Sequence, residues 1–582
     1  MGIFQIGRTA YAAPEWETVS AGSAEWALHA VADDAAMGLL DRDTAAIYRA
    51  YALFAPSKLP SRYQPTPNAD TDVESGHASC WTAALNELRV AYAELTPYAR
   101  EEIDRVAPSY IGLATHYRGG FAAPTLPDDS AILARDNFGD TGGLKVPHVH
   151  YTDHFAIRWG SSFEFADTSI TVEDLGEYLE DAWDLFVNDQ GYARPYQSND
   201  YYLDVYVGNS GSGSPGIGGG AAAYVTFYDV SSRDIFDSMN YMVIQKGVFS
   251  YGDYTREVVG HEFYHMIQFG AGIAHDCYDY MYTAASEGSA WAAEASAVWA
   301  EDEASPDSNF WVGFVSEAQN YPELSIMYFG GSLHYGRSLF FDYIDERHGG
   351  EEAIYALWNE CHASILDSAD ALLRDQGTSL HAMFPKYALA NFFGDYLEGD
   401  LFPTAPLHTQ FDDYPLEFVA GENLGDDVPE NFAANYLRFA PDSGNQLSFH
   451  FEGADRVGGR DVTWGIGVVK VDAVGDYDVE YYQAPADTKA LDDGDKVQAD
   501  FSVVGVGTKY DKIYLVLTPM TDQRSISSPS FNYSLDVTQE TVEEPEDEDD
   551  GGDFTGFGDD DEAEGDDDGD DDDDDGGAGC GA

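Results

Sequence analysis

The segment REVVGHEFYHMIQFG, residues 256–270, constrains the fold of this chain more than any other, because it sets polar groups within an apolar helical pattern. His261 and His265 stand four positions apart, with Glu262 beside the first. Residues at this spacing share one face of a helix, so both imidazoles can reach one metal ion. Glu262 can then reach a water molecule without being a ligand. Burying these groups without a partner would be costly, so the segment predicts a metal-binding helix; the competing interpretation is a helix with incidental surface histidines.

A zinc site that keeps one open position needs a third protein ligand. Residues 287–304, EGSAWAAEASAVWAEDEA, offer three glutamates at helical spacing. Glu294 shares a face with Trp291, where an unpaired carboxylate would be unfavourable, and it is the predicted third ligand. Glu287 stands near the helix start, where the helix dipole explains an acidic residue. Glu301, two turns after Glu294, suits the role of orienting a ligand histidine.

These two segments resemble a known family of enzymes. HEFYH followed by WAAEASAVWAE resembles the gluzincin clan of zinc metallopeptidases, in which a glutamate from a later helix completes HExxH. More narrowly, GHEFYHMIQFG, SAWAAEASAVWAEDE, the earlier DHFAIRWG and a trailing β-domain resemble a family of secreted bacterial metalloproteases first catalogued from myxobacteria. The resemblance covers about residues 145–540 and implies that His261, His265 and Glu294 bind zinc and that Glu262 is catalytic.

The sequence also departs from better-studied gluzincins. Position 298 is Val, where thermolysin-like enzymes carry Asp four residues after the ligand glutamate. The G-x-M-E-N signature of amino-terminal exopeptidases is missing, which favours an endopeptidase.

The expected reaction needs a base and an oxyanion donor. Glu262 would take a proton from water, whose pKa zinc lowers towards about 7, and deliver it to the leaving amine. The segment SIMYFGGSLHYGRSLFFDYI offers Tyr335 as the donor, with Tyr328 and His334 as alternatives. Tyr335 and the three residues after it are loosely similar to the Tyr-Glu-Lys-Gly stretch of the aminopeptidase branch. The other interpretation of these aromatic residues is core packing.

Periodicity divides the 582-residue chain into several regions. The predicted fold class is α+β: a mainly helical zincin-like domain with an N-terminal sheet, preceded by a helical region and followed by an all-β sandwich and a disordered acidic tail. The Gly-rich stretch GNSGSGSPGIGGGAAAY lacks a phosphate-binding pattern and is predicted to be a loop. The expected regions are a signal-peptide remnant over 1–12, a helical region or pro-segment over 13–140, the catalytic domain over 145–400, the sandwich over 405–538 and the tail over 539–582.

The net charge limits the classes of partner that we expect, and the cysteine content limits the number of disulfides. With 105 acidic and 29 basic residues the formal charge is −76, which excludes nucleic acid as an expected partner. No apolar run is long enough to span a membrane. Cys80, Cys277, Cys361 and Cys580 match no C-x-x-C motif, so we expect one disulfide at most. The Asp/Gly-rich tail is a candidate for weak Ca²⁺ binding and for cell-surface association, but a solvated linker is favoured because the tail lacks the loop glutamate of calcium sites.

The sequence therefore predicts a secreted or cell-surface bacterial zinc endopeptidase that acts on polypeptides. The alternative from another class is a non-catalytic or calcium-binding adhesion protein that retains the metallopeptidase fold. A zinc hydrolase of non-peptide amides is a third interpretation. The presence of Glu262, which no metal ligation requires, favours catalysis.

Overall fold

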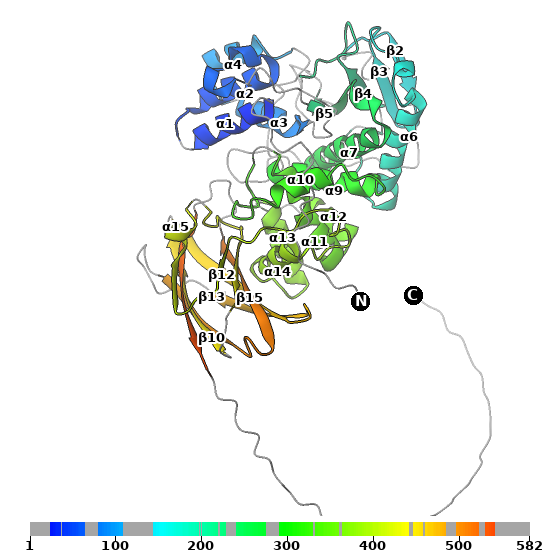
Figure 1. Cartoon of the computed structure of the whole chain (residues 1–582). Coiled ribbons are helices and arrows are strands. Elements are labelled where there is room, and N and C mark those ends of the chain that lie inside the picture. Colours follow the sequence, from blue (N-terminus) through cyan, green and yellow to red (C-terminus); the bar gives the residue numbers. More distant parts are fainter. Residues whose placement is uncertain are drawn as a thin grey trace, which may run out of the picture. The chain divides into compact units, whose positions relative to one another are not determined.

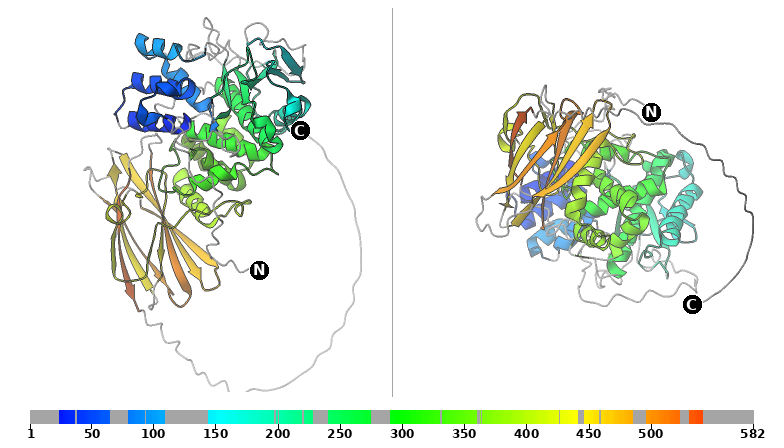
Figure 2. Two further views of the ribbon diagram at one scale, coloured as in Figure 1. Left: turned by 45° about the horizontal axis from the view of Figure 1, so that its top comes forward. Right: turned by 90° about the horizontal axis from the view of Figure 1, so that it is seen from below.

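In the residues that it describes, the computed structural model shows helices and three β-sheets (Figures 1 and 2), so the α+β prediction is confirmed at that level. The described residues are 24–36, 38–64, 79–92, 94–108, 144–196, 198–199, 201–218, 221–227, 240–274, 290–329, 332–359, 362, 364–425, 427–440, 446–457, 460–484, 496–522 and 530–541.

A six-stranded mixed sheet is formed by strands that all precede the HExxH helix, α7 (Gly252–Ala274), in the chain. Its order is β1-β5-β6-β4-β3-β2. Strands β3, β4 and β6 run parallel, β2 and β5 are antiparallel to their inner neighbours, and β1 is parallel to β5. The bounds are β1 (Ser79–Cys80), β2 (His148–Tyr151), β3 (Phe155–Trp159), β4 (Leu203–Gly208), β5 (Ala221–Phe227) and β6 (Asn240–Gln245).

The sheet predicted at the start of the catalytic region contains a strand-helix-strand run of β3, α6 (Val172–Trp183) and β4, with a π-helical turn η5 (Asp184–Asp189) after α6. Helix α6 starts at a capping box between Thr171 and Asp174. It packs beside α7, which contacts β5 and β6 (Figure 1).

Two local predictions at the sheet edge are wrong. Ser79 and Cys80, which lie in the region 13–140 that was expected to be helical, form β1 and pair with Ala221 and Ala223 of β5. The Gly-rich loop, expected to continue to Tyr224, ends earlier because β5 starts at Ala221. Alanine has little strand preference of its own, so pairing with β6 and β1 decides the conformation of β5.

Helices dominate the region before the sheet, as predicted. Asp41 caps α2, and Thr96 caps α4, which has Pro97 in its first turn. Helix α3 contacts both β5 and the later helix α9 (Ala290–Ala304), so this region shares the core of the sheet domain. The elements are α1 (Ala24–Ala36), α2 (Arg42–Phe54), η1 (Pro56–Lys58), η2 (Ser61–Tyr63), α3 (Thr82–Tyr92) and α4 (Pro97–Asp104).

The predicted helices after the sheet are present. Gly349 and Gly350, with φ of +125° and +71°, separate α11 from α12. Short 3-10 turns lie at η4 (Phe165–Asp167) and η7 (Val248–Ser250). The other elements are α7 (Gly252–Ala274), α9 (Ala290–Ala304), α10 (Val312–Ala318), η8 (Tyr335–Ser338), α11 (Leu339–His348), α12 (Glu351–Asn359), α13 (Ile365–Asp375) and α14 (Leu380–Phe393).

Two sheets enclose a second core, which confirms the β-sandwich (Figure 2). One has the order β14-β10-β16-β8; the other has β11-β12-β15-β9-β7, with β13 on β12. Burial alternates along β10, as a half-exposed strand requires. The elements are β7 (Thr409–Phe411), β8 (Leu416–Val419), α15 (Ala420–Asn423), β9 (Asn435–Phe439), β10 (Gln446–Ala454), β11 (Arg456–Val457), β12 (Arg460–Asp472), β13 (Tyr477–Ala484), β14 (Lys496–Val504), β15 (Tyr510–Thr521) and β16 (Tyr533–Glu540).

The predicted ends of the chain, 1–12 and most of 539–582, lie outside the described residues. The predictions about a signal remnant, the tail and its calcium binding therefore stay predictions. Within the part of the chain that the structure describes, none of the helices has the length and apolar character needed to cross a bilayer.

Candidate metal centre

Helices α7 and α9 approach closely, and this contact builds the site. A Cβ atom at Gly260 would lie 2.7 Å from Ala304 Cβ and 3.2 Å from the Ala300 carbonyl oxygen. Seven of the 15 residues of helix α9 are alanine, and the helix is buried along most of its length. Because small residues let the two backbones come together, Glu294 of α9 reaches His261 and His265 of α7.

We expect Gly260→Ala to lower the free energy of unfolding by about 1–3 kcal/mol, because the added methyl group would push α9 away from α7. The matched control is Gly252→Ala on the same helix, where the nearest atom to the new Cβ would be Ile170 Cγ2 at 3.6 Å. Denaturant unfolding of both variants measures the difference. Equal midpoints for the two variants would contradict the close helix contact.

The three predicted ligands are brought together. The Nε2 atoms of His261 and His265 are 3.1 Å apart. Glu294 Oε2 lies 3.3 Å from His261 Nε2 and 3.4 Å from His265 Nε2. Zinc binds such donors at about 2.0–2.2 Å in a tetrahedron, whose edges are then about 3.3–3.6 Å. The spacing of these donors therefore fits a zinc-sized ion with nitrogen and oxygen ligands.

A second ring of hydrogen bonds fixes both imidazoles. His261 Nδ1 lies 2.6 Å from Glu301 Oε1, the contact expected from the sequence. His265 Nδ1 lies 2.8 Å from Gln268 Oε1, and Gln268 Nε2 donates to Ser296 Oγ at 3.0 Å. Donation through Nδ1 leaves both Nε2 lone pairs directed at the shared position. Gln268 was missed in the sequence, although it stands three residues after His265 on the same helical face.

The charges of the site are strongly coupled. Burial alone would lower the pKa of His261, but hydrogen bonds to Glu294 and Glu301 outweigh it and raise this pKa to about 10. Burial would raise the pKa of Glu294, yet His265 and His261 hold it well below its usual range. A buried carboxylate kept charged among histidines provides the negative charge that a divalent cation needs.

Cys80 joins these three residues, which the sequence did not predict. One donor atom each of Cys80, His261, His265 and Glu294 lies within 4.8 Å of all the others. Cys80 Sγ also accepts a hydrogen bond from the Thr82 backbone N–H at 3.3 Å. The absence of a C-x-x-C spacing had excluded Cys80, but no local spacing can indicate a ligand that comes from a distant part of the chain.

Glu262 is 1% exposed and lies beside the donors. Its Oε2 atom accepts a hydrogen bond from Thr82 Oγ1 at 3.3 Å. Burial raises the pKa of Glu262 above its ordinary value, although electrostatic interactions with His261 and His265 oppose this effect. A carboxylate with a raised pKa is a better proton acceptor near neutral pH.

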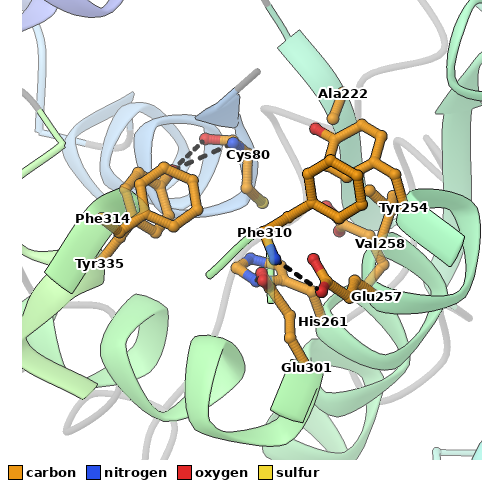
Figure 3. Close-up of a pocket in the computed structure, with 11 residues that line it drawn as sticks. Cys80, Ala222, Tyr254, Glu257, Val258, His261, Glu301, Phe310, Phe314 and Tyr335 are labelled. Atoms are coloured by element: carbon orange, nitrogen blue, oxygen red, sulfur yellow. Dashed lines mark hydrogen bonds and ion pairs between the residues drawn. The ribbon is translucent and has the colours of Figure 1, made fainter. Parts of the chain in front are cut away.

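Tyr335 lies in the same pocket (Figure 3), as expected for an oxyanion donor. Its ring centroid is 6.1 Å from that of His261. Its hydroxyl group contacts the backbone of Cys80, accepting from the N–H at 3.0 Å and donating to the carbonyl at 3.2 Å. The ring of His334 packs against Phe329 and Tyr335. Of the three candidates, Tyr335 is the one that lines this pocket.

Besides Glu262 and Glu301, the same pocket is lined by a third acidic residue, Glu257, which was not predicted from the sequence. It stands one turn before His261, and its Oε1 atom accepts a hydrogen bond from the Phe310 N–H at 3.0 Å. Burial and the nearby Glu301 raise its pKa to about 8. Figure 3 shows its side chain on the same side of the pocket as His261 and Glu301. The rival ligand Glu287 lies outside the described residues.

Comparisons with known proteins find weak structural similarity. No protein-family model and no curated protein match the chain. One similar structure is the pre-peptidase C-terminal domain of a collagenase from Bacillus anthracis: identity 14%, covering 23% of this chain and 100% of that chain, TM-score 0.13. Another is a family GH115 4-O-methyl-α-glucuronidase with specificity for decorated arabinogalactans: identity 8%, covering 43% of this chain and 32% of that chain, TM-score 0.15. At these scores neither likeness assigns a fold or an activity to this chain.

Proposed function

We propose that the chain is a zinc-dependent endopeptidase of the gluzincin type. The observation that carries the proposal is the spacing of three donor atoms, 3.1–3.4 Å apart, with the buried carboxylate of Glu262 beside them. His261, His265 and Glu294 would hold the ion. When bound, zinc supplies Lewis acidity, which makes water more acidic and polarises a carbonyl group.

The chain's own residues have separate tasks in this proposal. The Glu262 carboxylate takes a proton from the attacking water molecule and returns it to the amine that leaves. The Tyr335 hydroxyl group donates a hydrogen bond to the oxygen of the scissile carbonyl as its charge develops. Glu301 and Gln268 keep the imidazoles of His261 and His265 in orientation through their Nδ1 atoms.

A specific observation favours a second candidate function, a structural metal site. Structural zinc sites are closed by four protein ligands, and Cys80 provides a fourth donor here. In that case the ion would connect the N-terminal region to α7 and α9 and perform no chemistry. The position of Glu262 supports the protease instead, because a structural site has no use for a buried carboxylate that is not a ligand.

Metal removal tests the proposed function. Purified protein should contain one zinc per chain by elemental analysis and should cleave unfolded casein. Because Cys80 lies among the donors, the unaltered chain and Cys80→Ser are both assayed. Dialysis against 1,10-phenanthroline should abolish cleavage, and added zinc should restore it. A chain that contains zinc but does not cleave casein in either form would contradict the protease and favour the structural site.

We also propose that the protease acts outside the cell, on polypeptides. The excess of acidic residues supports a location where salt screens repulsion between carboxylates. Binding of Ca²⁺ by the acidic tail, and attachment to a surface through it, remain part of this proposal.

A further inference from the structure

We propose that residues 79–83, here termed the latch, occupy the substrate-binding edge of the sheet, with Cys80 as a removable fourth metal ligand. The described form is then a latent precursor of the enzyme. This inference rests on the proposed function, because it names the regulation of the same site.

The latch lies at one edge of the six-stranded sheet. Strand β5 is last in its sheet except for the two residues of β1. The latch covers it: Cys80 pairs with Ala223, and the Trp81 N–H donates to the Ala223 carbonyl at 3.2 Å. Further along, the Val225 N–H donates to Thr82 Oγ1 at 2.8 Å. An extended polypeptide adds to a strand edge through the same backbone groups, so the latch and a substrate would compete for β5.

The latch also contacts the side chains that would perform the reaction. Tyr335 contacts both backbone groups of Cys80, so the phenol that would donate to a substrate carbonyl already donates to a carbonyl of the latch. Thr82 Oγ1 donates to Glu262, the expected base. The Ala83 N–H donates to Glu294 Oε1 at 3.1 Å, on the ligand glutamate. A single five-residue segment therefore engages the base, the oxyanion donor and a metal ligand.

The thiol of Cys80 lies among the predicted metal ligands. A zinc site that performs hydrolysis keeps one position open, and three ligands here come from α7 and α9. Cys80 Sγ is the fourth donor atom in the cluster, so in this proposal it takes the position that an active site leaves to water. Figure 3 shows its sulfur atom directed towards His261. Release separates Sγ from the metal; it cleaves no bond of the chain and changes no oxidation state.

The experiment compares the full-length chain with Cys80→Ser and with the control Cys580→Ser, which removes a thiol from the acidic tail. Each protein is loaded with Co²⁺ for spectroscopy and with Zn²⁺ for assay. We expect a thiolate-to-cobalt charge-transfer band in the unaltered chain and the control, and its loss in Cys80→Ser with the metal retained. Casein cleavage should rise at least roughly tenfold in Cys80→Ser, because the fraction of open sites increases.

Three results would overturn the latch: no charge-transfer band in the unaltered chain, measurable and equal casein cleavage by the unaltered chain and Cys80→Ser, or loss of the metal in Cys80→Ser. The last would make Cys80 an obligatory ligand of a structural site. If the band behaves as expected but no form cleaves casein, the thiolate ligand is supported and the proposed protease function fails. Circular dichroism and denaturant unfolding of all three proteins establish that they are folded.

Discussion

Replacing Glu262 with glutamine should reduce casein cleavage by roughly 10²–10⁴-fold, the usual contribution of a general acid and base. Glutamine has nearly the same shape but cannot take up a proton. The zinc content should stay the same, because Glu262 is not among the residues whose donor atoms cluster. The variant is made in the Cys80→Ser background, where the site is expected to be open, and single-turnover cleavage is followed with zinc measured on the same samples.

The control for this experiment is Glu177→Gln, an exposed position on α6. It makes the same chemical change away from the pocket and should keep full cleavage. If Glu262→Gln cleaves casein as fast as the control, another group takes the proton and the proposed mechanism is wrong. Glu257 is then the next residue to test, because it lines the same pocket with a pKa of about 8.

The residues predicted from sequence were those whose role is encoded locally. His261, Glu262 and His265 lie on one helix, so their spacing already determines a shared face. Glu294 and Glu301 lie on a second helix, where apolar neighbours indicate which face is buried. The donor cluster and the contact between Glu301 and His261 follow from these two patterns together with one packing contact at Gly260.

What the sequence did not indicate depends on contacts between distant segments. The strand at Ser79 and Cys80 exists because β5 offers an edge, and the local helical periodicity of the following residues concealed it. Cys80 becomes a candidate ligand only through this pairing and through the hydrogen bonds of Tyr335 to its backbone. Strand β5 itself was hidden within a glycine- and alanine-rich run, since small residues have weak preferences that the neighbouring strands override.

The second large effect is expected at Glu294. Glu294→Gln should weaken zinc binding by more than about 100-fold, because it removes the negative charge from a buried ligand next to two histidines. The comparison is Glu301→Gln on the same helix. It changes only the hydrogen-bond partner of His261 Nδ1. Loss of such an outer partner typically weakens metal affinity by about 10- to 100-fold. Competition with a chromophoric chelator measures both dissociation constants.

This pair of variants separates the two roles that the glutamates of α9 can have. A ligand and its outer partner must differ in effect, since only the ligand contacts the ion directly. Equal weakening of zinc binding by the two variants would contradict these separate roles. If Glu301→Gln weakens zinc binding more than Glu294→Gln does, then Glu301 rather than Glu294 provides the third ligand. In that case the Glu294 carboxylate, which accepts a hydrogen bond from the latch residue Ala83, would serve to hold the latch. Unchanged affinity in both variants would place the metal elsewhere and remove the basis of the proposed protease.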